Sequence, residues 1–336
     1  MKKLRKILAG LLAVAMVAGL STAAFASEVV PPPTQGPTDI PTDTLTDTST
    51  VTITKTYTAT NEGTTSPAET FTLELLDSKV TDGDALTAPA LGPITGATFA
   101  AGAATAAGAV GEITIALPAY DKVGVYTYTL EEKQGSTAGV NYYMNTMKLV
   151  VSVVNGANGL VRVAAVYTDA EDGTKSDSFE NTYSAGTLDI TKTVTGNMGD
   201  KNKYFAFTVM LEGQDGMTYA DSYVVTGGSN EQNPTSIEIG KEATFYLKDG
   251  DTISIANLPY GVTYTVTEDA VDGYTTEKTG DTGTINAAQQ TAAFTNDKTG
   301  EIDMGVVTDS LPYVLLLVGA LAMGVMMVVS KRRNVE

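Results

Sequence analysis

The 336-residue sequence contains no cysteine, no histidine and no tryptophan. Without cysteine and histidine it lacks Ser-His-Asp and Cys-His nucleophile systems and the usual zinc ligand sets, so a conventional hydrolase is a disfavoured class. We expect no metal and no other cofactor. The lack of cysteine also excludes disulfides, which are the usual covalent support of exported domains. An exported chain of this composition therefore needs another source of stability.

Basic residues are scarce as well, because 21 Lys and Arg stand against 39 Asp and Glu and give a formal net charge of −18. A strongly acidic surface repels phosphate groups, which makes nucleic acid and anionic membrane surfaces disfavoured partners. The simplest role of this acidity is to keep an exported protein soluble.

The two ends of the chain carry the patterns of export and anchoring. Residues 1–26 combine a basic start, an apolar run and small residues at Ala24 and Ala26, which is typical of a secretory signal peptide. Residues 311–330 are uncharged and long enough for a transmembrane helix, and the basic tail 331–336 follows them. This order predicts an exported protein whose precursor is anchored in the membrane, with residues 331–336 inside the cell.

Between these ends the sequence predicts a leader and two β-domains. Residues 27–50 are rich in Pro, Thr and Asp and poor in large apolar residues, which is typical of a disordered leader. Short alternating segments rich in Val, Ile, Thr and Tyr then predict β-strands and no amphipathic helix. We expect an all-β protein with two tandem β-sandwich domains, residues 51–184 and 185–297, followed by a sorting-signal region, residues 298–310.

The two predicted domains repeat the same motifs in the same order. "TITKTY", "TFTLEL", "VGVYTYTLEE" and "SFEN" in the first correspond to "DITKTV", "YFAFTVML", "YGVTYTVTED" and "AFTN" in the second. Because alternate residues of a strand share a face, one Lys, one Glu and one Asn of each domain fall on apolar stripes. These residues are Lys55, Glu132 and Asn181 in the first domain and Lys192, Glu268 and Asn296 in the second. Glu131 competes with its neighbour Glu132, but parity favours Glu132.

An amine, a carboxyl and an amide that are buried separately are costly, whereas the three groups can satisfy one another when they meet. Desolvation lowers the pKa of a lysine and raises that of a glutamic acid, so the pair can exist as neutral amine and neutral acid. A neutral amine is a nucleophile, and an asparagine carbonyl polarised by the protonated acid is its electrophile. The repeated pattern therefore predicts one intramolecular Lys-Asn isopeptide bond in each domain, formed once with loss of ammonia, between the first strand and the last.

These motifs resemble the isopeptide-bonded backbone pilins of Gram-positive bacteria, especially the two-domain streptococcal type. The similarity runs from about Val51 to the C-terminus and is most specific in "TLDITKTVTGNMGDKNKYFAFTV", "NLPYGVTYTVTED" and "AFTND". The resemblance implies Ig-like domains of the collagen-adhesin B (CnaB) type, joined by a sortase into a covalent fibre of identical subunits. It implies the bonds Lys55 to Asn181 and Lys192 to Asn296, assisted by Glu132 and Glu268. It also implies a pilus attached to the cell wall, with minor pilins or peptidoglycan as further partners.

The same resemblance implies a linkage lysine and a sorting motif. The segment "DGTKSDSFEN" matches the place where related pilins carry the lysine that joins subunits, which is Lys175 here, although an ordinary exposed loop lysine is an equal alternative. Where relatives have a sorting signal of the Val-Pro-Thr-Gly kind, this chain has "EIDMGVV". Asp303 replaces the Pro, Met304 replaces the Thr, and Gly305 is kept. Either the sortase accepts this divergent motif, or the protein remains anchored in the membrane.

The sequence thus predicts a structural subunit of a pilus shaft rather than an enzyme. The alternative is a singly anchored adhesin or minor pilin of the same fold that binds a host ligand. A secreted enzyme has little support, because the composition leaves no set of nucleophile, base and orienting residue.

Overall fold

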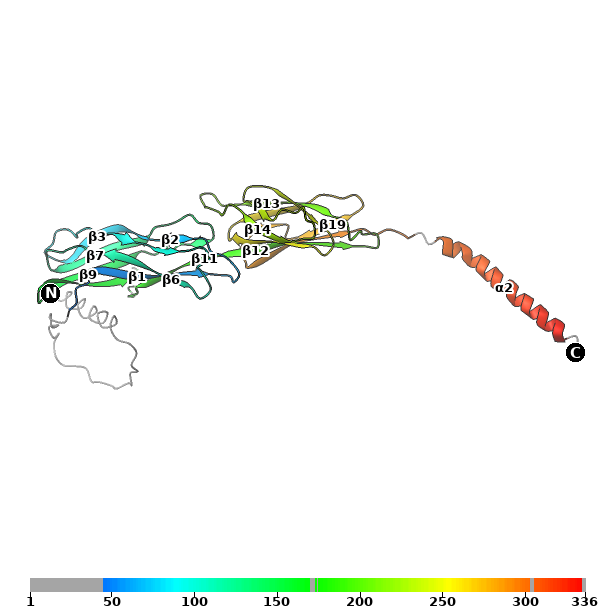
Figure 1. The fold of residues 1–336 in the computed structure, drawn as a ribbon, viewed down its shortest axis with the longest axis horizontal. Helices are drawn as coiled ribbons and strands as arrows, with labels where there is room; N and C mark the ends of the chain where they lie inside the picture. The colour runs from blue at the N-terminus through cyan, green and yellow to red at the C-terminus, as the bar shows by residue number, and fades with distance from the viewer. Residues whose placement is uncertain (1–44, 170–172, 174, 303–304, 334–336) are drawn as a thin grey trace, which may run out of the picture.

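The computed structural model describes residues 45–169, 173, 175–302 and 305–333, and these form an all-β protein with one helix near the C-terminus (Figure 1). Two elongated β-sandwiches lie end to end, each with its own hydrophobic core. The predicted all-β class is therefore confirmed. The predicted signal peptide, residues 1–26, lies outside the described residues, and so do residues 27–44 of the predicted leader.

The first sandwich contains eleven strands: β1 (Thr50–Ala59), β2 (Glu69–Phe71), β3 (Leu73–Gly83), β4 (Ile94–Thr95), β5 (Ala97–Phe99), β6 (Ala109–Ala116), β7 (Gly124–Glu132), β8 (Val140–Asn141), β9 (Met147–Gly156), β10 (Gly159–Tyr167) and β11 (Ser178–Tyr183). One sheet has the strand order β4-β6-β1-β11-β8, and the facing sheet has the order β10-β9-β7-β3. Strands β2 and β5 form a separate short pair.

The second sandwich contains ten strands: β12 (Ala185–Thr195), β13 (Phe205–Glu212), β14 (Tyr223–Gly227), β15 (Ser236–Ile237), β16 (Ala243–Leu247), β17 (Thr252–Pro259), β18 (Thr263–Glu268), β19 (Thr275–Thr279), β20 (Thr282–Thr284) and β21 (Gln289–Asp297). Its sheets have the orders β15-β14-β17-β12-β21-β19 and β16-β13-β18-β20. Only Ser184 separates β11 from β12, so the connection between the sandwiches is very short.

Threonine alternates with apolar residues along the strands and produces their two different faces. In β1, with sequence TVTITKTYTA, Val51, Ile53, Lys55 and Tyr57 are buried, and the threonines between them are exposed or half-buried. This is the period of two that a half-buried strand requires. The pattern places a charged lysine in the hydrophobic core, among residues that are otherwise apolar.

The first and last strands of each sandwich are parallel neighbours in the same sheet. In the first sandwich, β1 pairs with β11, and Lys55 lies opposite Phe179. In the second, β12 pairs with β21, and Lys192 lies opposite Phe294. In both pairs the asparagine of interest lies two residues beyond that phenylalanine, so the register is the same.

The residues just before β1 pack against the first sandwich. The Thr48 N–H donates to the carbonyl of Arg162 at 2.9 Å, and Arg162 Nε donates to Asp47 Oδ1 at 2.9 Å. These hydrogen bonds from Arg162 lower the pKa of Asp47 below its ordinary value. Residues 47–50 are therefore held in place, although composition alone assigned them to the disordered leader, because composition does not reveal a single ion pair.

Helix α2 (Gly305–Arg333) contains residues 311–330, which were predicted to cross the membrane. Within the part of the chain that the structure describes, no helix is both long enough and apolar enough to span a bilayer. The membrane span stays a prediction from the sequence.

Candidate functional site

The first sandwich brings Lys55, Glu132 and Asn181 together in its core. Lys55 comes from β1 and Asn181 from the neighbouring β11, whereas Glu132 ends β7 in the facing sheet. The three residues are at most 1% exposed. Parity along β7 explains the position of Glu132, because Tyr126, Tyr128 and Leu130 of the same face are also buried, whereas Glu131 is only half-buried.

Lys55 and Asn181 meet at a single oxygen atom of Glu132. Lys55 Nζ lies 2.9 Å from Oε1, and Asn181 Nδ2 donates to Oε1 at 3.0 Å and to Oε2 at 2.8 Å. The backbone N–H of Tyr143 also donates to Oε2, at 2.7 Å, and so fixes the orientation of the carboxylate. The Lys55 contact has ion-pair distance without hydrogen-bond alignment, so its Nζ is left without a hydrogen-bond acceptor among the described atoms.

The second sandwich repeats this arrangement with Lys192, Glu268 and Asn296. Lys192 Nζ donates to Glu268 Oε1 at 2.9 Å and to Oε2 at 3.1 Å, and Asn296 Nδ2 donates to the same Oε1. Lys192 and Asn296 are buried, and the Glu268 side chain is 2% exposed. Amine and amide therefore share one carboxylate oxygen in both sandwiches.

Aromatic rings enclose both lysine amines. Lys55 Nζ lies 3.7 Å from the ring centroid of Phe179 and 4.8 Å from that of Phe71. Lys192 Nζ lies 4.3 Å from the ring centroid of Phe205. These rings exclude water and give the cation a weak electrostatic partner. Sequence reasoning did not identify them as part of the site, although the Phe-x-Asn spacing around Phe179 was a usable signal.

The asparagine amides are oriented differently from the expected arrangement. The sequence predicted that the glutamic acid polarises the asparagine carbonyl, but in both sites Nδ2 faces the carboxylate. The Oδ1 atoms of Asn181 and Asn296 are buried and have no hydrogen-bond partner among the described atoms. A buried carbonyl without a donor is unfavourable, so a protonated glutamic acid in this position would favour reversal of the amide.

Burial changes the acidity of both amines. Desolvation lowers the pKa of Lys55 from its ordinary 10.5 to about 8, although Glu132 acts in the opposite direction. Desolvation also lowers the pKa of Lys192, again against the opposing effect of its glutamate. Near pH 8 a substantial fraction of Lys55 is therefore an uncharged amine, which is the nucleophilic form.

This lowered pKa predicts a pH-dependent stability in Asn181→Ala, which has no amide to react with the lysine. Between pH 8 and 10.5 the unfolded chain binds more protons at Lys55 than the folded chain, so the free energy of unfolding should rise with pH in this range. Urea denaturation at several pH values measures this slope. Adding Lys55→Met removes the titrating group and should remove the additional slope; equal slopes in the two variants would contradict the prediction.

The other predicted residues lie outside these two sites. Lys175 is half-buried in the segment between β10 and β11. Asp303 and Met304 lie outside the described residues, and Gly305 is the first residue of α2. Among the residues that the structure describes, no cluster of three or more Asp and Glu could hold a metal ion.

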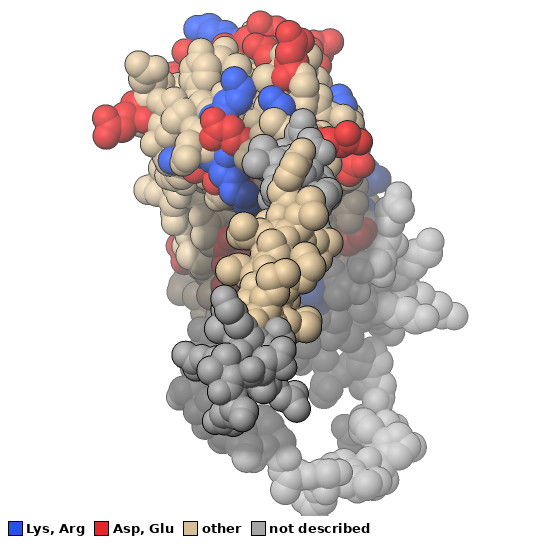
Figure 2. All heavy atoms as spheres, turned by 90° about the vertical axis from the view of Figure 1, so that its right-hand side faces the viewer, with Lys and Arg blue, Asp and Glu red and all other residues tan. Residues whose placement is uncertain are grey.

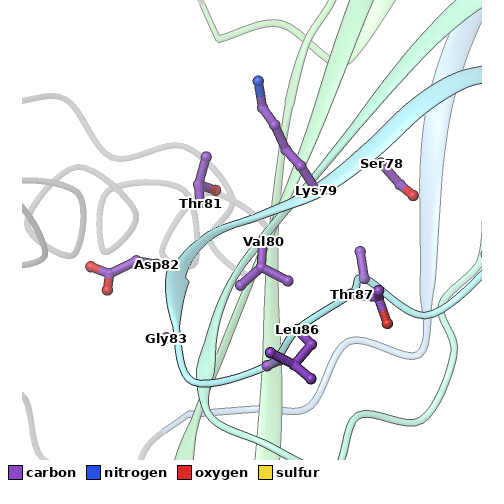
Figure 3. Close-up of a pocket in the computed structure, with 10 residues that line it drawn as sticks. Ser78, Lys79, Val80, Thr81, Asp82, Gly83, Leu86 and Thr87 are labelled. Carbon is purple, nitrogen blue, oxygen red and sulfur yellow. The ribbon is translucent and has the colours of Figure 1, made fainter.

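A surface pocket next to the end of β3 does not contain a comparable arrangement. Residues 78–83 and 85–88 line it. Figure 3 shows the side chains of Lys79 and Asp82 pointing in different directions rather than towards a common point. The two buried sites are therefore the stronger candidates for function.

Comparison with known proteins identifies the family. Residues 51–184 match a domain family described as Spy0128-like isopeptide containing, and residues 186–298 match a domain family of unknown function. A curated pilin of Streptococcus pyogenes serotype M1 is 31% identical over 237 residues, which cover 64% of this chain and 69% of that protein. The chain belongs to the pilin family of Gram-positive bacteria. The resemblance to backbone pilins that the sequence indicated is thus confirmed.

Two further comparisons concern the fold and a part of the chain. The crystal structure of the major pilin from Streptococcus pyogenes covers 76% of this chain and 100% of its own, with a TM-score of 0.51 at 24% identity, which shows a shared fold. The pilus tip adhesin Cpa of Streptococcus pyogenes is 33% identical over 129 residues, which cover 36% of this chain and only 18% of the adhesin.

Proposed function

We propose that this pilin is a structural subunit of a pilus shaft, stabilised by two self-formed Lys-Asn isopeptide bonds and joined head to tail by a sortase. One observation carries the proposal: each sandwich buries the same Lys-Glu-Asn set, in which amine and amide meet at one carboxylate oxygen. The proposed bonds are Lys55 to Asn181 and Lys192 to Asn296. Each sandwich is proposed to be an Ig-like domain of the CnaB type.

The proposed reaction is the same in both sandwiches and is described for the first. Glu132 accepts a proton from Lys55, which leaves a neutral amine beside a neutral acid. Lys55 Nζ attacks Cγ of Asn181 and forms the new C–N bond. Glu132 then relays protons to Nδ2, and the Cγ–Nδ2 bond breaks. Two of the three Nζ protons leave with that nitrogen as ammonium, so the carboxylate is restored.

The positions of the bonds suit a protein that carries tension. Each bond would join the first strand of a sandwich to the last, which are already parallel neighbours. The chain enters and leaves the sandwich on these two strands, so a covalent link between them bypasses all the strands between. Such a link also supplies the covalent support that a chain without cysteine lacks.

The distribution of charge agrees with an exported protein that does not bind nucleic acid. On the face seen in Figure 2, which looks onto the C-terminal end, Asp and Glu side chains lie among those of Lys and Arg. We propose that the mature protein lies on the cell surface in a wall-attached pilus, after removal of the signal peptide from a membrane-anchored precursor. Minor pilins and peptidoglycan are the further partners of such a fibre.

The alternative function is a singly anchored adhesin or minor pilin. The match to the tip adhesin Cpa favours it, but that match covers only 18% of the adhesin. The match to the pilin covers 69% of that protein and, at 237 residues, is longer than either sandwich. The shaft subunit is therefore the better-supported function.

Extraction of the native cell wall tests the shaft function. We expect a ladder of species that resist SDS, spaced by the mass of one subunit, and we expect Lys175→Arg to reduce it to a single band because arginine cannot form the amide. Lys122→Arg is the matched control and should keep the ladder. A single band from the unmodified protein would support the adhesin instead, and a ladder that survives Lys175→Arg would assign the linkage to another lysine.

A further inference from the structure

An asparagine side chain of the second sandwich holds a residue of the first. Asn257 Oδ1 accepts a hydrogen bond from the Thr65 N–H, and Asn257 Nδ2 donates to the Thr65 carbonyl, both at 2.9 Å. One amide group thus pairs with both backbone groups of a single residue, as a neighbouring β-strand would. This contact crosses from one sandwich to the other.

The backbone of Asn257 has a conformation that is uncommon for a residue other than glycine. Its φ of 61° makes it the one non-glycine residue with a left-handed backbone among the residues described. It lies in β17 opposite the register shift between Gly186 and Leu188 of β12. Such conformations persist where the surrounding contacts impose them, and they cluster at sites with a role beyond folding.

Two other asparagines make the same bidentate contact, and neither of them has a left-handed backbone. Asn233 pairs with the N–H and carbonyl of Tyr246, and Asn197 pairs with those of Gly300. Asn233 and Tyr246 both belong to the second sandwich. Within the described chain, Asn257 alone uses this contact to join the two sandwiches.

The first sandwich returns a similar contact from the same loop. Asn61 Nδ2 donates to the Ala185 carbonyl at 2.8 Å and to the Tyr260 hydroxyl at 2.7 Å. The Tyr260 N–H in turn donates to the carbonyl of Ser184, the residue that connects the sandwiches, at 3.0 Å. The segment from Asn61 to Thr65 is therefore attached to the second sandwich at both its ends.

A second loop of the first sandwich is attached separately. The Thr218 N–H donates to the Ser136 carbonyl at 2.6 Å, and the Ala138 N–H donates to the Thr218 carbonyl at 2.9 Å. The covalent connection at Ser184 is thus supplemented by two hydrogen-bonded attachments. A hinge at Ser184 could open only if these contacts broke.

We propose that Asn257 and Asn61 lock the two sandwiches into one rigid body. The described contacts of this lock are made by amide, hydroxyl and backbone groups, all uncharged, so salt does not weaken them as it weakens ion pairs. The lock does not depend on the isopeptide bonds, and it sets the shape of the subunit whether or not those bonds form.

Spin labels on two introduced cysteines test the lock in the full-length chain, which has no cysteine of its own. Thr52→Cys and Thr263→Cys put one label on an exposed strand position of each sandwich. Pulsed dipolar spectroscopy should give a narrow distance distribution in the parent, unchanged at about 1 M salt. Asn257→Gly combined with Asn61→Ala should widen the distribution by about twofold, because only the attachment at Thr218 then opposes bending at Ser184.

Glycine at position 257 keeps the left-handed backbone available, so this variant removes the side chain without adding strain. Asn233→Gly is the matched control, because it removes the same bidentate contact inside one sandwich, and its distribution should stay narrow. An equally narrow distribution in the Asn257→Gly, Asn61→Ala variant would overturn the lock. Equal widening in the control would also overturn it, because the effect would then be general loosening.

Discussion

Replacing Glu268 with Gln should lower the melting temperature of the second sandwich by about 20 °C. Glutamine cannot relay the proton, so the Lys192–Asn296 bond does not form and the loop of 104 residues that it closes is released. By analogy with a disulfide, closing a loop of this size stabilises the folded state by about 5 kcal/mol, because the open unfolded chain has more freedom. Calorimetry of the exported part measures the shift.

Intact mass links this loss of stability to the bond. We expect the parent to weigh about 34 Da less than its sequence requires, and Glu268→Gln about 17 Da less than its own, one ammonia being lost per bond. Glu277→Gln, on the exposed strand β19, is the control and should keep both the mass deficit and the melting temperature. A parent of full calculated mass would refute both bonds, and a destabilised Glu268→Gln that keeps both mass losses would refute the role of Glu268.

Pulling the molecule between residues 175 and 298 should separate the roles of the two bonds. Along this path the chain runs from Lys175 through β11 and β12 to Lys192, and then crosses the second bond to Asn296. Loss of that bond in Glu268→Gln should add about 350 Å of contour length, because about 104 residues can then extend. Glu132→Gln should add none, because the Lys55–Asn181 bond lies beside this path rather than on it.

Single-molecule force spectroscopy on Lys175→Cys, Lys298→Cys handles measures these lengths. A second pair of handles at residues 50 and 298 is the control, because both bonds lie on that path. With these handles Glu132→Gln should add about 430 Å, since the first loop contains 126 residues. If Glu132→Gln lengthened the shorter path as much as Glu268→Gln did, the assignment of load to the second bond would be wrong.

The parity of strand residues was sufficient to predict much of the site. Counting by twos along a strand put Lys55, Glu132 and Asn181 on buried faces, and the structure places all three in one core. The count works because a half-buried strand has only two faces, so a polar residue in the apolar series must point inward. The repeat in the second half gave the corresponding residues independently.

Contacts that depend on loops or on side-chain rotation could not be predicted in this way. Nothing in the sequence around Tyr143 indicates that its backbone N–H meets Glu132, because the loop between β8 and β9 has no periodic pattern. The orientation of the Asn181 amide depends on one side-chain torsion, which strand parity does not determine. The left-handed backbone of Asn257 could not be predicted from the sequence either, because it accompanies a register shift between β17 and β12.

The single residue between β11 and β12 has a consequence for the size of the fibre. Because Ser184 is the only residue between β11 and β12, the two sandwiches cannot move apart along the long axis of the subunit at this point. In the proposed shaft, each added copy would contribute a constant length, so the distance that the fibre extends from the cell would be proportional to the number of its subunits. Such a fibre would keep a fixed length per subunit rather than extend under load.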